Sequence, residues 1–128
     1  MNKELIQKLV EHAKAAADNA YCPSTHTPEG ASLLVEGNII VSGCNIEFAF
    51  DIHTAGEVVL TKAFSEGMTN FIAICFWSKN ILPFPTGKFL QIASEFNPGL
   101  DIIVANDTTY SLHKLHDLLP YRRIISEE

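Results

Sequence analysis

The sequence predicts a three-layer α/β/α domain, in which helices cover both faces of a mixed sheet of about five strands. Its 128 residues match the commonest size of a single domain that buries its own core. Segments with helical periodicity alternate with short apolar runs in the order α-β-β-α-β-α-β, which favours a mixed sheet between helices. No linker, repeat or low-complexity tract interrupts the chain, so residues 1–128 are expected to form one domain.

The first elements are a helix and a hairpin. Apolar residues recur through residues 5–20 with the spacing of an amphipathic helix, which should end before Pro23. Two apolar strands, 31–34 and 39–41, flank the segment 36–38. This segment contains Gly and Asn, which tolerate the positive φ angles of a tight turn, so we expect antiparallel pairing.

The middle of the chain predicts a helix followed by a buried strand. Thr54 and Glu57 have the spacing of a capping box, and the apolar residues that follow continue as a helix that stops at Gly67. The continuous apolar run 71–77 is typical of a central strand covered on both faces. The remaining elements are expected to be a helix from Thr86 to about Phe96, strands at 100–105 and 108–112, and a closing helix at 113–119 that ends before Pro120.

Composition excludes several classes of partner. The formal charge is −6 and the only adjacent basic pair is Arg122-Arg123, so no basic stripe predicts nucleic-acid binding. The longest apolar run is too short to cross a membrane, and the charged N-terminus is unlike a signal peptide, so a cytoplasmic protein is expected. Cys22, Cys44 and Cys75 lack the spacing of a zinc site or a disulfide framework and are expected to be reduced, mostly buried thiols.

Five segments, in their order and spacing, resemble the cytidine deaminase family. They are AYCPSTHTPEGASLL, GCNIE, TAGEVVLTKAFSEG, PTGKFLQIASEFNPGLDIIV and HDLLP. The VVL of residues 58–60 and the NPGLDIIV run look most similar to the blasticidin-S deaminase branch. The resemblance covers nearly the whole chain and implies the three-layer fold of that family.

The resemblance does not extend to the residues that carry the family's chemistry. There, a Cys-Ala-Glu tripeptide and a Pro-Cys-Gly-x-Cys motif supply three thiolates that hold zinc and a glutamate that moves protons. The matching positions here are Thr54, Ala55 and Gly56 for the tripeptide, and Thr86 and Phe89 for the two cysteines of the second motif. Neutral hydroxyls are poor zinc ligands, and Phe and Gly offer none. The resemblance therefore implies no catalytic residue, no metal ligand and no cofactor in this chain.

A ligand pocket is nevertheless implied. The Asn and Glu that hold ribose hydroxyls in the family match Asn45 and Glu47, whereas the aromatic residue that stacks on the base falls on Thr27 and the next apolar residue on Glu29. Two helix starts facing one pocket would favour an anion, with Lys88 nearby. The residues expected to bind a nucleoside, nucleotide or small anion are Asn45, Glu47, Thr54, Thr86 and Gly87.

The same residues also have purely structural interpretations, which the sequence leaves open. Thr54 and Thr86 are expected to cap helices. Asn45 and Glu47, which alternate along an extended segment, could hydrogen-bond loop backbone instead of a ligand. Gly56 in the first turn of a helix indicates either close backbone packing or a site no longer under selection for activity.

Three functions remain as hypotheses. The first is a catalytically inactive relative of the deaminases with a binding or regulatory role. The second is an enzyme of another class, or a diverged deaminase with a metal site rebuilt from His26, His53, Glu57 and Asp51. The third is a structural subunit, since the resemblance implies a homo-oligomer, either a dimer or a tetramer.

Overall fold

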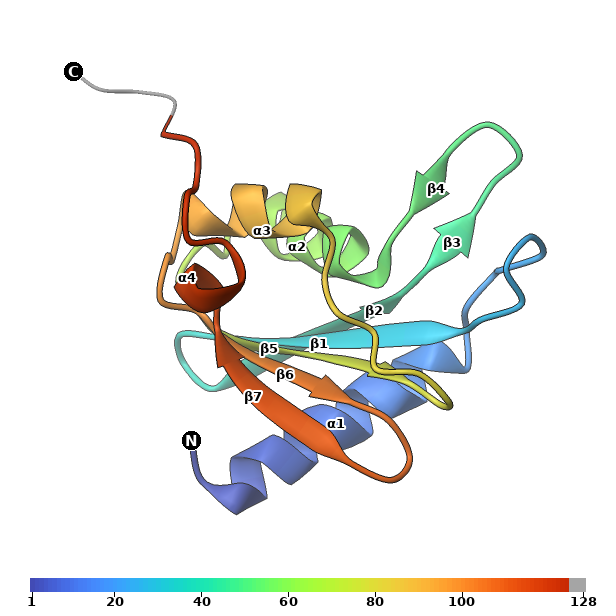
Figure 1. Cartoon of the computed structure of the whole chain (residues 1–128), viewed down its shortest axis with the longest axis horizontal. Coiled ribbons are helices and arrows are strands. Elements are labelled where there is room, and N and C mark those ends of the chain that lie inside the picture. The colour runs from blue at the N-terminus through green and yellow to red at the C-terminus, as the bar shows by residue number, and fades with distance from the viewer. Residues whose placement is uncertain (125–128) are drawn as a thin grey trace.

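A mixed sheet forms the centre of the molecule (Figure 1). The computed structural model describes residues 1–124. In spatial order the five strands are β2 (Ile39–Cys44), β1 (Glu29–Val35), β5 (Phe71–Ser78), β6 (Asp101–Ala105) and β7 (Tyr110–Lys114). β5 and β6 pair in parallel, and all other neighbouring strands of this sheet pair antiparallel.

Helices cover both faces of this sheet, which confirms the predicted three layers. Helix α1 (Lys3–Ala17) packs on one face, and α2 (Ala55–Ser65), α3 (Gly87–Ser94) and α4 (Leu115–Leu118) lie on the other (Figure 1). Successive side chains of β5 point to opposite faces of the sheet. Ile74 and Phe76 pack in the core under α2 and α3. Ala73, Cys75 and Trp77 pack in the core against α1. A strand buried on both faces reads as a continuous apolar run.

The predicted hairpin between the first two strands is confirmed. β1 and β2 pair antiparallel, with Leu33 opposite Val41. Gly37 and Asn38 have φ angles of 88° and 64°, the positive values that a tight turn between strands requires. The N-terminal layer depends on another glycine, because a Cβ on Gly30 would lie 1.8 Å from the carbonyl oxygen of Ala13 in α1.

The closing elements differ from the prediction at their boundary. The last strand begins at Tyr110 because the side chain of Asn106 accepts hydrogen bonds from the N–H groups of Thr108 and Thr109, which shapes these residues as a turn. His113, predicted to start the closing helix, is instead paired with Ile102 in the sheet, and α4 begins at Leu115. Pairing with a buried strand has overridden the local helical pattern.

A small second sheet was not predicted. Strands β3 (Ile46–Glu47) and β4 (Ile52–His53) form a short hairpin that extends from the end of β2 to the start of α2 (Figure 1). Tyr21 bridges to Ile46, which fixes the chain after α1 against this hairpin. The hairpin therefore connects the N-terminal loop to the start of α2.

The last two sequence expectations concern membrane-spanning segments and the cysteines. No helix within the described residues is long and apolar enough to cross a membrane. The three cysteines are free, with Cys44 and Cys75 buried and Cys22 half-buried. Burial raises the pKa of the Cys75 thiol to about 12, so this side chain behaves as a small apolar residue.

Candidate functional site

The starts of α2 and α3 are both capped by threonine. Thr54 accepts a hydrogen bond at Oγ1 from the backbone N–H of Glu57 at 3.3 Å, and Thr86 accepts one from the N–H of Phe89 at 3.1 Å. The structural interpretation of both threonines is thus confirmed. Their hydroxyl oxygens are directed at their own helices.

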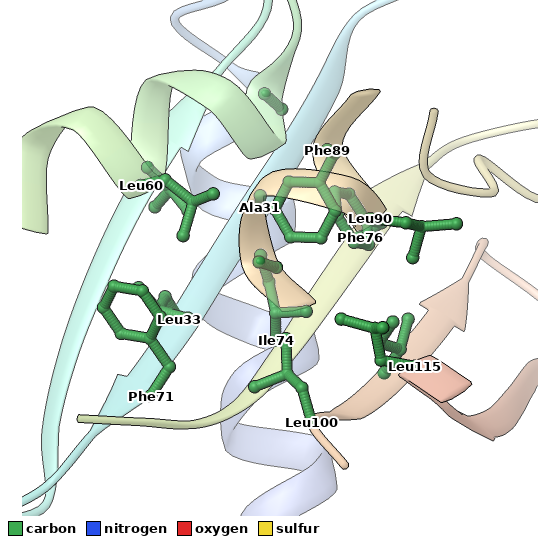
Figure 2. Packing of buried hydrophobic residues seen from close by; sticks show 14 of the residues in the cluster. Ala31, Leu33, Leu60, Phe71, Ile74, Phe76, Phe89, Leu90, Leu100 and Leu115 are labelled. Atoms are coloured by element: carbon green, nitrogen blue, oxygen red, sulfur yellow. The ribbon is translucent and has the colours of Figure 1, made fainter. Parts of the chain in front are cut away.

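The space between these two helix starts is filled by aromatic rings. Phe89 is only 1% exposed, and its ring meets that of Phe76 edge to face, with centroids 5.1 Å apart and an interplanar angle of 90°. Figure 2 shows both rings within the core between the helices and the sheet. A Cβ on Gly56 would lie 2.8 Å from each ring, so this position has no space for a side chain. Close packing explains Gly56.

Beside this apolar contact lies a polar pocket of about 250 Å³, referred to below as the Asn45–Glu47 pocket. It lies where the N-terminal loop, the small hairpin and the start of α2 meet, and the loop after β5 contributes one wall. Its lining consists of Thr25, Thr27, Glu29, Asn45, Glu47, Ile52, His53, Thr54 and Ile81. The structure therefore brings together three of the five predicted binding residues.

Asn45 is almost fully buried and holds one wall of this pocket. Its side-chain oxygen accepts a hydrogen bond from the N–H of Glu29 at 2.9 Å, and its amide nitrogen donates to the carbonyl of Thr27 at 3.0 Å. These two bonds fix the chain where it enters β1. The backbone-supporting role considered for Asn45 is present in the structure.

Glu47, which is 5% exposed, supports the adjacent part of the same loop. Oε1 accepts from the N–H groups of Ser24 and Thr25 at 3.0 and 3.1 Å, and Oε2 accepts from the Thr25 hydroxyl at 2.7 Å. A carboxylate offers about four lone-pair positions, so Oε2 keeps one for another donor. Glu47 can therefore support the loop and still accept from a ligand.

The two carboxyl groups of the pocket have opposite pKa shifts. The hydroxyl and backbone N–H of Thr25 lower the pKa of Glu47 by hydrogen-bonding its charged form. Burial raises the pKa of Glu29, and the nearby charge of Glu47 raises it further. The pocket is consequently rich in acceptors and electronegative, which disfavours anions and favours hydroxyl or amino donors.

The other two predicted binding residues are placed differently. Thr86 and Gly87 are exposed and do not line the Asn45–Glu47 pocket. Lys88, expected to assist an anion, forms a 3.1 Å ion pair with Glu57. This pair lies along a groove of about 360 Å³ between α2 and α3, so the lysine charge is already neutralised by a carboxylate.

The rebuilt metal site proposed from sequence is not formed. Nε2 of His53 lies 3.4 Å from Oδ2 of Asp51. The carboxylate of Glu57, however, forms an ion pair with Lys88, and His26 lines a separate cavity beside Trp77. Within residues 1–124, no group of three or more His, Cys, Asp or Glu side chains is arranged to hold a metal ion. The hypothesis was wrong because spacing along the chain does not bring these side chains to one point.

Sequence reasoning missed three residues that line the pocket. Thr25 is the direct partner of Glu47, while Ile52 and Ile81 supply apolar walls. The position of Thr25 among small polar residues of a loop gave a weak signal, since such residues often bond nearby carboxylates. Ile52 and Ile81 lie in segments with no helical or strand periodicity, so no sequence pattern placed them.

No protein-family model matches the chain. It is similar to a cytidine deaminase of Sporosarcina psychrophila, with 33% identity over 105 residues, which cover 79% of this chain and 77% of the relative. It is also similar to a probable cytidine deaminase of Dictyostelium discoideum, with 32% identity over 124 residues that cover 94% and 84% of the two chains.

Solved structures give the same result. The chain superimposes on a cytidine deaminase from Burkholderia pseudomallei with a TM-score of 0.87 at 28% identity, covering 96% of this chain and 100% of the other. For the cytidine deaminase from Mycobacterium tuberculosis, the TM-score is 0.82 at 26% identity, with coverage of 94% and 98%. The similarity therefore extends over both chains almost completely.

Proposed function

This chain belongs to the cytidine deaminase family, and on that premise we propose that it binds a nucleoside-like ligand without carrying out zinc-dependent deamination. The proposal has two parts, the loss of the metal-based chemistry and the retention of a polar pocket. The first part is carried by one observation, the buried contact of Phe89 with Phe76 and Gly56.

The residues at the positions matching the family's zinc ligands do not fit the metal. Zinc in proteins is bound by thiolate, imidazole or carboxylate groups. Thr54 and Thr86 have neutral hydroxyls that accept from their own helices, and Phe89 has no donor atom. Gly56, at the position of the glutamate, has no carboxylate, and the two rings leave no space for one. These features support a domain that cannot assemble the family's catalytic centre.

The second part rests on the Asn45–Glu47 pocket. Glu47 retains an acceptor position and Asn45 is held rigidly beside it, an arrangement suited to the hydroxyl groups of a sugar. Two carboxyl groups in the lining disfavour phosphate or another anion. We therefore favour a neutral nucleoside over the nucleotide or anion that the helix starts alone predicted.

Isothermal titration calorimetry tests this proposal with cytidine and uridine as ligands. Titrations with ribose and with cytosine measure binding of the two halves of the nucleoside separately. A titration with phosphate at matched ionic strength measures whether the pocket binds an anion. We expect saturable binding of a nucleoside, weaker binding of either half and no heat from phosphate. Chromatography of the same cytidine solution after prolonged incubation should show no uridine above the spontaneous background.

Two variants test whether binding uses the described pocket. Glu47→Gln should weaken nucleoside binding by about tenfold or more, because a hydrogen bond to a charged acceptor contributes about 1.5–3 kcal/mol. The matched control is Glu57→Gln, which removes a carboxylate from the neighbouring groove and should leave binding unchanged. Steady formation of uridine would refute the first part of the proposal, and absence of nucleoside binding would refute the second.

A further inference from the structure

A second cavity, referred to below as the Trp77 cavity, lies where the end of helix α1 meets the end of strand β5. The two ends meet because β1, which follows the loop after α1, starts opposite Ser78. The volume of the cavity is about 440 Å³. This value falls within the range of roughly 300–1,000 Å³ that is usual for small-molecule pockets. The lining consists of Ala17, Asp18 and Ala20 at the end of α1, residues 26–28, and residues 77–81.

The Trp77 cavity adjoins the Asn45–Glu47 pocket but differs from it in charge. Thr27 and Ile81 line both. Asp18 and Lys79 line only the Trp77 cavity, whereas the two glutamates of the Asn45–Glu47 pocket do not line it. The Trp77 cavity is therefore suited to a different class of ligand, and the function proposed above gives it no role.

An indole ring provides the largest apolar group of this cavity. Trp77 is 6% exposed, so most of its ring is covered by the core against α1 and a small part remains accessible. Pro28 and Ile81 extend the apolar surface, and α1 contributes only the short side chains of two alanines beside them. An aromatic ring flanked by aliphatic groups favours contact with another apolar or aromatic side chain.

Two opposite charges line the cavity from different walls. Asp18 is the C-cap residue of α1, and Lys79 directly follows β5. Within residues 1–124, neither side chain forms an ion pair, with the other or with any third residue. The nearby Lys14, 5.7 Å from the centroid of the Trp77 ring, is already paired with Asp107 at 3.3 Å. The C-terminal end of α1 carries partial negative charge, which adds to the preference of Asp18 for a cation.

We propose that the Trp77 cavity binds a free α-amino acid with an apolar side chain. Its ammonium group pairs with Asp18, its carboxylate pairs with Lys79, and its side chain packs against Trp77. An anion would be attracted by Lys79 but repelled by Asp18, and a cation would meet the reverse. A zwitterion interacts favourably with both charges and brings no net charge into the cavity.

Fluorescence of the unmodified protein tests the proposal, because Trp77 is the only tryptophan of the chain. L-phenylalanine and L-leucine, titrated to millimolar concentrations, should each change this fluorescence saturably. Two analogues separate the contributions of the charges, since 3-phenylpropionate lacks the ammonium group and phenethylamine lacks the carboxylate. Each analogue should bind at least about tenfold more weakly than L-phenylalanine, because each loses one charged hydrogen bond.

Three variants assign each charge of the ligand to its partner. Asp18→Asn should weaken L-phenylalanine binding about tenfold but should not weaken 3-phenylpropionate binding, since that analogue has no ammonium group. Lys79→Gln should weaken L-phenylalanine binding but not phenethylamine binding. The matched control is Glu11→Gln, which removes an exposed carboxylate of α1 outside the cavity and should leave all affinities unchanged.

Three results would each overturn the proposal. They are the absence of a saturable response to both amino acids, equal affinity for L-phenylalanine and its two analogues, and equal effects of Asp18→Asn and Glu11→Gln. The analogue series uses no variant, so it remains decisive even if a variant fails to fold. No nucleoside enters these titrations, so this proposal and the proposed function fail independently.

Discussion

At the residue scale, Gly56 and Phe89 depend on each other. The glycine has no Cβ, which lets the rings of Phe89 and Phe76 approach the backbone of α2, and Phe89 in turn fills the volume beside that backbone. Neither residue is explained alone, since Gly in a helix is costly and a fully buried Phe at the start of α3 needs a space of suitable shape. The pair forms a structural contact in the core.

This dependence predicts a coupled effect on stability. Gly56→Ala should lower the free energy of unfolding by about 1–3 kcal/mol, because the added methyl group overpacks the site. In a Phe89→Leu background the same change should cost much less, and urea unfolding of the double-mutant cycle measures the difference. Gly87→Ala is the matched control, since a Cβ there has no neighbour within 4 Å and should not destabilise. Additive effects would contradict the proposed contact.

The two carboxyl groups that line the pocket, Glu47 and Glu29, should make the free energy of unfolding depend on pH in opposite ways. Glu47 has a lowered pKa, so its stabilising effect is present at neutral pH and is lost as the pH falls below the ordinary Glu range of about 4–5. Glu29 has a raised pKa, so the stability tied to its neutral form is present at low pH and is lost as the pH rises through that raised pKa.

Two substitutions separate these contributions. At pH 7, Glu47→Gln should lower the free energy of unfolding and Glu29→Gln should raise it, whereas both differences should shrink near pH 3. Chemical unfolding at a series of pH values measures each curve. Thr25→Ala should reproduce part of the Glu47→Gln effect, since the Thr25 hydroxyl is the main cause of the lowered pKa. Parallel curves for the two glutamine variants would refute this assignment.

At the scale of elements, the starts of α2 and α3 are fixed by their caps. Replacing Thr86 by Ala should cost about 1 kcal/mol of stability, and Thr86→Ser should restore most of it, because either hydroxyl can accept from the N–H of Phe89. Thermal or urea unfolding measures both. If Thr86→Ser were as destabilising as Thr86→Ala, packing of the threonine methyl group rather than capping would be its main contribution.

The elements also indicate how far sequence could predict this structure. Periodicity and turn residues located the helices, the β1–β2 hairpin and the buried strand β5, because each has its own local signal. The predicted start of α4 was wrong because His113 pairs with Ile102 on a neighbouring strand, a contact between residues that are not adjacent in the sequence. The β3–β4 hairpin was missed because it has two residues in each strand and exposed Phe48 and Phe50 between them.

The candidate site was predictable only in part, for a related reason. Thr54 and Thr86 could be identified as caps from the residues that follow them. Asn45 and Glu47 were expected to face one cleft, and both line the same pocket, but their hydrogen-bond partners in the loop residues 24–29 depend on how the small hairpin folds. Gly56 had two interpretations in sequence, and only its proximity to Phe89 in the fold distinguished them.

At the scale of the whole molecule, the fold matches that of the family, and its core contains the buried contact of Phe89 and Phe76 with Gly56. If this contact replaces the metal centre, as we propose, four changes together, Thr54→Cys, Gly56→Glu, Thr86→Cys and Phe89→Cys, should be needed to create zinc binding. Gly56→Glu alone should bind no zinc and should be destabilised, because a carboxylate would be forced against two buried rings. Zinc titration and unfolding measurements on the single and fourfold variants check this. Zinc binding by the single variant would contradict the account.

The zinc content of the purified, unmodified protein tests the central claim most directly. The protein should be expressed with zinc in the medium, dialysed against a mild chelator and analysed by elemental mass spectrometry. Because neither thiolates nor other suitable ligands among residues 1–124 converge at the starts of α2 and α3, we predict about one tenth of an equivalent of zinc per chain or less. Close to one equivalent of zinc retained after chelation would contradict it.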